Sequence, residues 1–210
     1  MPNQKILYVT TEMFPYQEDS NMAMMVNKMA LKMHQEGNDV RVFMPRFGFI
    51  SERKFQLHEV IRLSGMNIII NDLDQPLIIK VASLPGERLQ VYFIDNEEYF
   101  KRKQYYQDED NQPFDDNDER AIFFARGVIE TIKKLNWVPD IIHFNGWMAS
   151  FIPIYLKNYY KTDSYFNDTK LVLSVYNEKD LSLGDNITEK LKFDNIENLK
   201  ALEEPTIQSF

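Results

Sequence analysis

Residues 115–157 read DDNDERAIFFARGVIETIKKLNWVPDIIHFNGWMASFIPIYLK, and this stretch decides the fold. Asp116 or Asn117 can cap a helix whose apolar residues recur every three to four positions. Pro139 ends that pattern, because proline disfavours the helical region for the residue before it. The short apolar run Asp140–Asn145 follows, and such a run is typical of a central parallel strand that is covered on both faces.

A second helix is predicted after this strand, from Trp147 to Tyr160, with Gly146 breaking the chain between them. In open α/β sheets, ligands bind beyond the carboxyl ends of the strands. The sequence therefore predicts that His143–Met148 lies where the chemistry takes place.

Length and composition limit the possible classes. A chain of 210 residues with 44% hydrophobic content can bury a core, and we expect one domain over residues 1–210. The formal charge of -8 argues against a nucleic-acid partner. The sequence has no cysteine, no secretion signal and no apolar segment long enough for a membrane span, so a cytoplasmic location without membrane association is expected.

The first part of the chain predicts a strand, a helix and a strand. Lys5–Thr10 and Asp39–Met44 are the strands, and the helix begins at Asn21 and ends at Gly37. Its apolar positions are Met22, Met25, Val26, Met29, Ala30 and Met33. This face either packs on the sheet or binds an apolar partner, and the core interpretation is favoured.

The middle of the chain predicts an antiparallel β-meander inserted between α/β units, with its last strand returning to the main sheet. Its four β-like runs are Leu57–Leu63, Met66–Asn71, Leu77–Ala82 and Leu89–Ile94, with turns at 71–74 and 85–86. A further buried strand is expected at Lys170–Val175.

Two loops have alternative interpretations. Arg46 follows the second strand and either holds a sugar hydroxyl or phosphate or pairs with a carboxylate. The aromatic and acidic segment 99–118 either contacts a sugar or is a solvated loop that its aromatic rings pin to the body.

Four collinear segments resemble the N-terminal domain of bacterial glycogen synthases and plant starch synthases. They are KILYVTTEMFPY (5–16), DVRVFMPRFGFI (39–50), the stretch 115–157 and KLVLSVYN (170–177). The resemblance implies an α/β fold: a Rossmann-like three-layer α/β/α domain with a mostly parallel sheet and the inserted meander. It would be one half of a two-domain GT-B type glycosyltransferase, and we expect this half to be truncated at its C-terminal end.

The resemblance also implies an activity. The family transfers glucose from ADP-glucose to an α-1,4-glucan with retention of configuration and without a metal. The N-terminal domain receives the glucan and the C-terminal domain holds the nucleotide. The implied partners are therefore α-1,4-glucan or maltooligosaccharide, and ADP-glucose bound with a C-terminal domain or a second chain.

The donor-side motif departs from the family pattern. The family loop carries lysine, then Gly-Gly-Leu-Gly-Asp, whereas residues 18–24 here read EDSNMAM, which places Glu18 at the lysine. The family's His-x-His-Asp-Trp-His is HFNGWM at 143–148, and its later His-Asn is Tyr176-Asn177. We assign no catalytic residue and expect this chain alone to be inactive.

The positions that remain are predicted to bind substrate: Glu12, Tyr16, Arg46, His143, Asn145, Trp147 and Asn177. A structural role for His143, hydrogen-bonded at the end of its strand, is the favoured alternative. No cofactor or metal is expected, since three scattered histidines form no ligand cluster.

Three functions stay open at this stage. The chain is a divergent synthase half, a non-catalytic glucan-binding or regulatory partner of a true synthase, or another α/β nucleotide-binding module. The third is disfavoured because the sequence has no glycine-rich phosphate loop.

Overall fold

The computed structural model describes residues 3–177, 183, 186–197, 199–200, 203 and 206. The strands are β1 Lys5–Thr10, β2 Asp39–Pro45, β3 His58–Glu59, β4 Met66–Ile70, β5 Leu73–Ser83, β6 Gln90–Asp95, β7 Ile141–Asn145 and β8 Lys170–Ser174. The helices are α1 Asn21–Gln35, α2 Glu52–Phe55, α3 Glu97–Phe100, α4 Asn117–Lys134, α5 Trp147–Lys157, the 3-10 turn η1 Ser164–Phe166, and α6 Ile187–Phe193.

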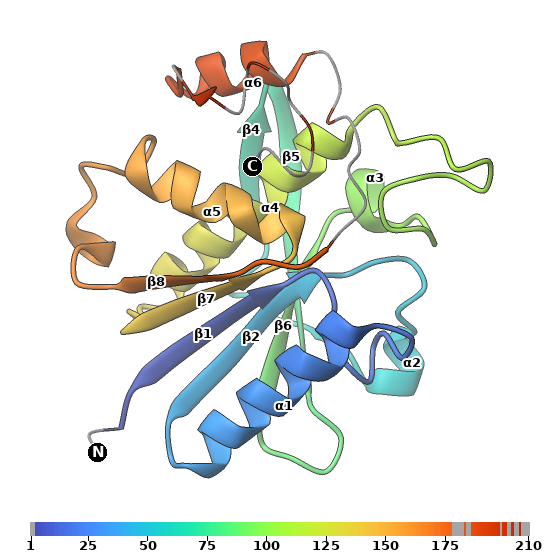
Figure 1. Ribbon diagram of the computed structural model, residues 1–210, viewed down its shortest axis with the longest axis vertical. Coiled ribbons are helices and arrows are strands. Elements are labelled where there is room, and N and C mark those ends of the chain that lie inside the picture. The colour runs from blue at the N-terminus through green and yellow to red at the C-terminus, as the bar shows by residue number, and fades with distance from the viewer. Residues whose placement is uncertain are drawn as a thin grey trace.

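The strands form a mostly parallel sheet in the order β3-β5-β6-β2-β1-β7-β8, with β4 paired to β5 outside this path. Strands β6, β2, β1, β7 and β8 run parallel to one another. Helix α1 covers one face of the sheet, while α4 and α5 cover the other (Figure 1). The predicted α/β class with three layers is confirmed.

The inserted meander is also confirmed. Strand β5 pairs antiparallel with β3, β4 and β6, and β6 returns to the main sheet beside β2. The turn between β4 and β5 is at Asn71 and Asp72, both with positive φ (44° and 70°), as a tight hairpin turn requires. The strand predicted at Leu57–Leu63 is wrong in extent, because only His58–Glu59 pairs with β5.

Helix α4 is the centre of the core. It contacts the sheet through β6 and also contacts the β4–β5 hairpin, α5 and α6. Its residues from Arg120 to Ile129 are all buried, so this middle part of the helix lies in the core, with Arg120 and Arg126 among the buried residues. A Cβ at Gly127 would lie 3.1 Å from Ile94 and 3.2 Å from Leu77, so this glycine allows the close approach to the sheet.

Helix α1 packs on the sheet as the core interpretation predicts, although the methionine face is only partly buried. Met22, Val26 and Ala30 are buried, whereas Met25 is half exposed.

The predicted buried strand at Lys170–Val175 is wrong in its burial. Strand β8 forms at Lys170–Ser174, but every apolar residue in it is exposed, because β8 is the last of the described strands at that end of the sheet. Helix α5 also ends at Lys157, three residues before the predicted Tyr160. Within the described residues, no helix has the length and apolarity that crossing a bilayer requires.

Candidate functional site

Three loops meet at the carboxyl ends of β1, β7 and β8. Thr10, Asn145 and Ser174 stand in register across these strands. The Thr11 amide donates a hydrogen bond to the Asn145 carbonyl over 3.2 Å. The strand-end position predicted for residues 143–148 is therefore correct, and residues after β1 and β8 join it.

Gly146 connects β7 to α5 in a conformation that glycine alone adopts readily, with φ 85° and ψ 159°. A Cβ at this position would lie 2.1 Å from the Thr11 hydroxyl oxygen and 3.2 Å from the Met22 sulfur. The site therefore has no room for a side chain at 146. Trp147, which follows Gly146 and is the first residue of α5, is buried.

Asn145 and His143 are both hydrogen-bonded within the protein. The Tyr176 hydroxyl donates to Asn145 Oδ1 over 2.8 Å, and Asn145 Nδ2 donates to the His143 carbonyl over 3.2 Å. His143 Nε2 lies 2.8 Å from Ser174 Oγ. Burial lowers the pKa of the His143 imidazole, so the neutral ring is favoured. This arrangement matches the structural alternative for His143, while its substrate-binding role stays a prediction.

Glu12 follows β1 and is tied to the start of α1. The Ser20 hydroxyl donates a hydrogen bond to Glu12 Oε2, while Ser20 Oγ accepts from the Ala23 amide and caps the helix. Burial raises the pKa of the Glu12 carboxyl, and the hydrogen bond from Ser20 partly offsets this. Sequence reasoning missed Ser20 as a partner, although a serine before a helical pattern is the usual cap signal.

Glu18, in the same loop, lies at the protein surface. It is exposed, and its carboxylate lies 3.6 Å from the Lys54 ammonium, which is equally exposed. An ion pair of this kind contributes little to stability, because water screens both charges. The negative charge of Glu18 therefore faces the positive charge of Lys54 at the protein surface.

Arg46 pairs with carboxylates, which was one of its two alternatives. Its Nε lies 3.2 Å from Asp95 Oδ2, and its Nη2 lies 3.2 Å from Glu52 Oε1. Lys80 contacts the same two carboxylates at 2.8 Å and 2.7 Å. Burial opposes the charge on Lys80, but its hydrogen bonds to Asp95 and Glu52 outweigh this and raise its pKa. Asp95 ends β6 and was missed, since nothing in its local sequence distinguishes it.

Tyr16 and Asn177 lie apart from these contacts. The Tyr16 side chain is 5% exposed and packs edge-on against Phe55 and Phe93, so it belongs to the core. Its hydroxyl has no hydrogen-bond partner among the described residues. Asn177 is exposed just beyond β8. Substrate binding by either residue stays a prediction.

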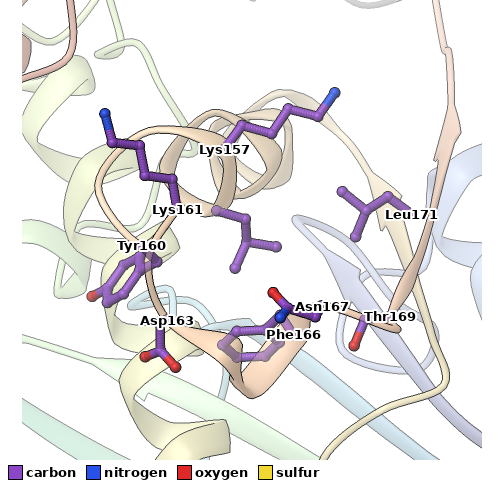
Figure 2. Close-up of a pocket in the computed structure, with 9 residues that line it drawn as sticks. Lys157, Tyr160, Lys161, Asp163, Phe166, Asn167, Thr169 and Leu171 are labelled. Carbon is purple, nitrogen blue, oxygen red and sulfur yellow. The ribbon is translucent and has the colours of Figure 1, made fainter.

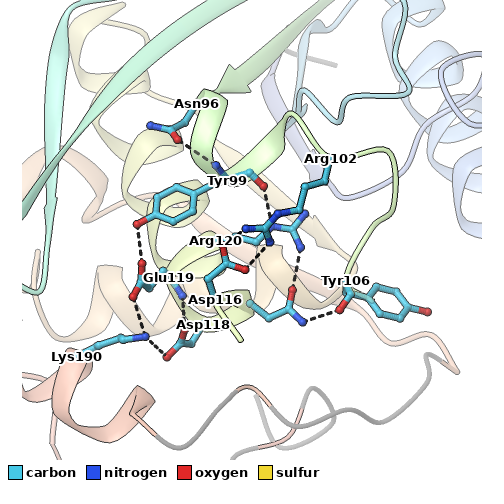
Figure 3. Close-up of polar contacts among 10 residues, drawn as sticks. Asn96, Tyr99, Arg102, Tyr106, Asp116, Asp118, Glu119, Arg120 and Lys190 are labelled. Carbon is cyan, nitrogen blue, oxygen red and sulfur yellow. Dashed lines mark hydrogen bonds and ion pairs between the residues drawn. The ribbon is translucent and has the colours of Figure 1, made fainter. Parts of the chain in front are cut away.

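Polar contacts hold the aromatic and acidic segment, some within it and some to helix α4 (Figure 3). Arg102 binds Asp116 at 2.5 Å and 2.6 Å. The buried Arg120 donates to the Tyr99 carbonyl over 2.8 Å, and its guanidinium lies 5.3 Å from the centre of the Phe114 ring. These contacts favour the pinned-loop interpretation over sugar contact.

No group of three or more histidine, aspartate or glutamate side chains that could hold a metal ion occurs in the part of the chain that the structure describes.

The chain is similar to proteins of one family. The starch synthase catalytic domain family matches residues 5–206. Glycogen synthase from Chlorobium limicola is 41% identical over 176 residues, and glycogen synthase from Chlorobium phaeobacteroides is 39% identical over the same length. Each comparison covers 83% of this chain and 36% of the relative, so the chain spans about a third of their length.

A solved structure has the same fold. The catalytic domain of starch synthase IV from Arabidopsis thaliana, bound to ADP and acarbose, matches with a TM-score of 0.72. The match covers 86% of this chain and 36% of that chain, at 18% sequence identity.

Proposed function

The chain belongs to the family of starch synthase catalytic domains, and from that premise we propose that it is the glucan-acceptor half of a glycogen-synthase-like glycosyltransferase. Its ligand is α-1,4-glucan or maltooligosaccharide. ADP-glucose binds only together with a C-terminal nucleotide domain or a second chain. The Arabidopsis starch synthase IV domain was solved with ADP and acarbose, which supports ligands of this kind for the fold.

We also propose that the chain by itself does not transfer glucose. The observation that carries this is that the polar groups at the carboxyl edge bond to one another. Glu12 is held by Ser20, Asn145 by Tyr176 and His143 by Ser174. Position 146 has no side chain, and the Thr11 hydroxyl occupies the space that one would need.

The loss of several donor groups should slow glycosyl transfer strongly. Glycosyl transfer needs donors aimed at the leaving phosphate and at the charge that develops on the sugar, and removing one such donor typically costs about 10²–10³ in rate. In the donor-side loop a carboxylate, Glu18, stands where the resemblance implies a lysine. Several such losses together leave no measurable turnover.

Two measurements test the proposal. Calorimetry should detect maltoheptaose binding to the purified chain and no binding of ADP-glucose. Glucan-stimulated release of ADP from ADP-glucose should be absent, also for Glu18→Lys, because one restored cation does not replace the other groups. ADP release by either protein would contradict the inactivity, and absence of maltoheptaose binding would contradict the acceptor role.

A matched pair of variants locates the glucan. Asn177→Ala changes an exposed asparagine beside the strand ends and should weaken maltoheptaose binding about fivefold, the loss of a hydrogen bond worth about 1 kcal/mol. Asn67→Ala changes an exposed asparagine on the hairpin strand β4 and should leave binding unchanged.

A second candidate is a non-catalytic regulatory partner of a true synthase. Glu18 favours it, because an exposed carboxylate, paired at the surface with Lys54, stands where the resemblance implies a lysine. This candidate predicts that the chain changes the rate of an active glycogen synthase in a mixed assay. The acceptor-half proposal predicts no such change.

A further inference from the structure

Helix α4 begins with two carboxylates that share one ammonium group. Asp118 and Glu119 lie in its first turn, and Asp118 is fully buried. Lys190 of α6 places its Nζ 2.7 Å from Asp118 Oδ2 and 2.9 Å from Glu119 Oε1. Burial raises the pKa of the Asp118 carboxyl, and the hydrogen bond from Lys190 acts against this shift. Because a buried carboxylate without a counter-charge is costly, this ammonium group fixes α6 to the start of α4.

Tyr99 connects this ion pair to the aromatic and acidic segment (Figure 3). Its hydroxyl donates to Glu119 Oε2 over 2.8 Å, while Lys190 binds the other oxygen of the same carboxylate. Its backbone carbonyl accepts from Arg120 Nε over 2.8 Å. Its ring packs against Phe123 of α4, with the ring centres 5.3 Å apart. Helix α4 therefore holds Tyr99 by its hydroxyl, its ring and its carbonyl.

Arg120 connects Tyr99 to the far part of the segment. Its Nη1 donates to Asn117 Oδ1 over 2.8 Å, and Asn117 Nδ2 donates to the Tyr106 carbonyl over 2.7 Å. Arg120 is fully buried, and burial lowers its pKa to about 9. A buried donor that loses its acceptor is costly, so the guanidinium depends on its bonds to Tyr99 and Asn117. The positions of Tyr99 and Tyr106 are therefore linked through one side chain.

This part of the segment lies next to the candidate site. Tyr105, beside Tyr106, packs its ring edge-on against Phe47 and Phe49, with ring centres 4.9 Å apart in both pairs. Burial raises the pKa of the Tyr105 hydroxyl, and the negative charge of Glu12 adds to this, which places the two groups near each other. The Tyr105 hydroxyl has no hydrogen-bond partner among the described residues. The segment therefore forms a wall of the site at Glu12, one of the residues predicted to bind substrate.

We propose that Lys190 and Tyr99 are positioning residues for the glucan site. They hold the aromatic and acidic segment so that Tyr105 stays beside Glu12. Lys190 is 8% exposed and Tyr99 is 2% exposed, so both act through other groups and neither touches the glucan. Helix α6 thus sets the shape of a site to which it contributes no ligand group. The inference rests on the proposed function, since it takes maltooligosaccharide as the ligand of that site.

A matched pair of tyrosine variants separates positioning from a general loss of stability. Tyr99→Phe removes the hydroxyl that donates to Glu119, and Tyr160→Phe removes a hydroxyl that donates to Glu130 of the same helix over 2.7 Å. Burial and the neighbouring glutamate raise the pKa of both phenols, so the two bonds have similar surroundings. Tyr160 lies in another part of the fold, where it lines a pocket together with Asp163 (Figure 2). The two variants therefore lose equivalent bonds from one helix.

Calorimetry with maltoheptaose gives the first readout. Tyr99→Phe should raise the Kd about fivefold, because binding must then restore the order that one hydrogen bond provides. Tyr160→Phe should stay within about twofold of the unchanged chain. Equal Kd values for the two variants would overturn the proposal.

A lysine pair on α6 tests the other positioning residue. Lys190→Met removes the ammonium group from Asp118 and Glu119 and should also raise the Kd for maltoheptaose at least about fivefold. Lys192→Met changes an exposed lysine of the same helix and should leave the Kd within about twofold. Equal Kd values for these two variants would contradict the role of Lys190. If Lys190→Met does not fold, the tyrosine pair decides alone.

Amide hydrogen exchange gives a second readout, which needs no glucan. The Gly48 amide donates to the Arg102 carbonyl over 2.8 Å, and the Phe114 amide donates to the Tyr106 carbonyl over 3.0 Å. Gly48 and Phe114 therefore report on the placement of the segment, while the amides of the central strand β1 report on the stability of the whole fold.

The tyrosine pair should differ only at these two reporter amides. They should exchange at least about tenfold faster in Tyr99→Phe than in Tyr160→Phe, while the β1 amides exchange at equal rates in both. Equal rates at the reporter amides, or a rise that includes β1 to the same degree, would overturn the proposal. If no variant binds maltoheptaose and the reporter amides still respond as expected, the proposed function fails while Tyr99 keeps its role in holding the segment.

Discussion

Gly146→Ala tests the central geometric claim about the site, namely that position 146 has no room for a side chain. The substitution adds one methyl group where φ is 85°. That methyl group would lie 2.1 Å from the Thr11 hydroxyl oxygen, well inside van der Waals contact. The substitution therefore has two separate energetic costs, backbone strain and a steric clash with Thr11.

The magnitudes follow from the geometry. A side chain in this region of φ and ψ costs about 1–3 kcal/mol of strain. Forcing Thr11 and its neighbours to move costs about 1–3 kcal/mol more, as overpacking does in other cores. The loss of backbone freedom in the unfolded chain returns only about 0.4–1 kcal/mol. We expect Gly146→Ala to destabilise the fold by about 1–6 kcal/mol, a fall of about 2–4 °C in Tm for each kcal/mol.

Urea unfolding followed by tryptophan fluorescence measures this, since Trp147 is the next residue. Gly65→Ala is the matched control: its φ is 79° and nothing lies within 4 Å of an added Cβ, so it reports strain without a clash. Thr11→Ala combined with Gly146→Ala should recover the clash energy of about 1–3 kcal/mol, as a double-mutant cycle shows. Equal costs for Gly146→Ala and Gly65→Ala, with no coupling to Thr11, would refute the reasoning.

Three further predictions concern other buried polar groups. Burial lowers the pKa of His143, so the unfolded chain binds that proton more readily, and stability should fall as pH drops from 7 through the ordinary value of about 6.5 to the folded pKa. His143→Gln should flatten this dependence in urea titrations at several pH values, and an unchanged dependence would contradict the prediction. Tyr16→Phe removes a buried hydroxyl that has no partner among the described residues, and should leave stability equal or raise it by up to about 1 kcal/mol; a loss above 1 kcal/mol would mean that the hydroxyl is bonded. Lys190→Met leaves the fully buried Asp118 without the ammonium 2.7 Å away, and should lower the free energy of unfolding in urea by about 3 kcal/mol. A loss below about 1 kcal/mol would mean that solvent reaches this pair.

Local pattern was enough to place most of the elements. Strand β1 was predicted at Lys5–Thr10 and is found there, because a short apolar run that ends in polar residues fits few structures other than a strand. Helix α4 and strand β7 likewise follow from the 3.6-residue period and the proline after it. Burial of β8 was predicted wrongly, since exposure depends on which strand lies next to it.

The sequence by itself determined the fold class, the position of residues 143–148 at the carboxyl end of β7, and the residue types that stand there. Only the tertiary structure decided how those residues are used. Thr11 meets Gly146, Tyr176 meets Asn145, and Asp95 meets Arg46 across strands that are far apart in the chain. Such pairs depend on distances of about 3 Å between segments separated by up to 135 residues, and periodicity along one segment carries no information about them.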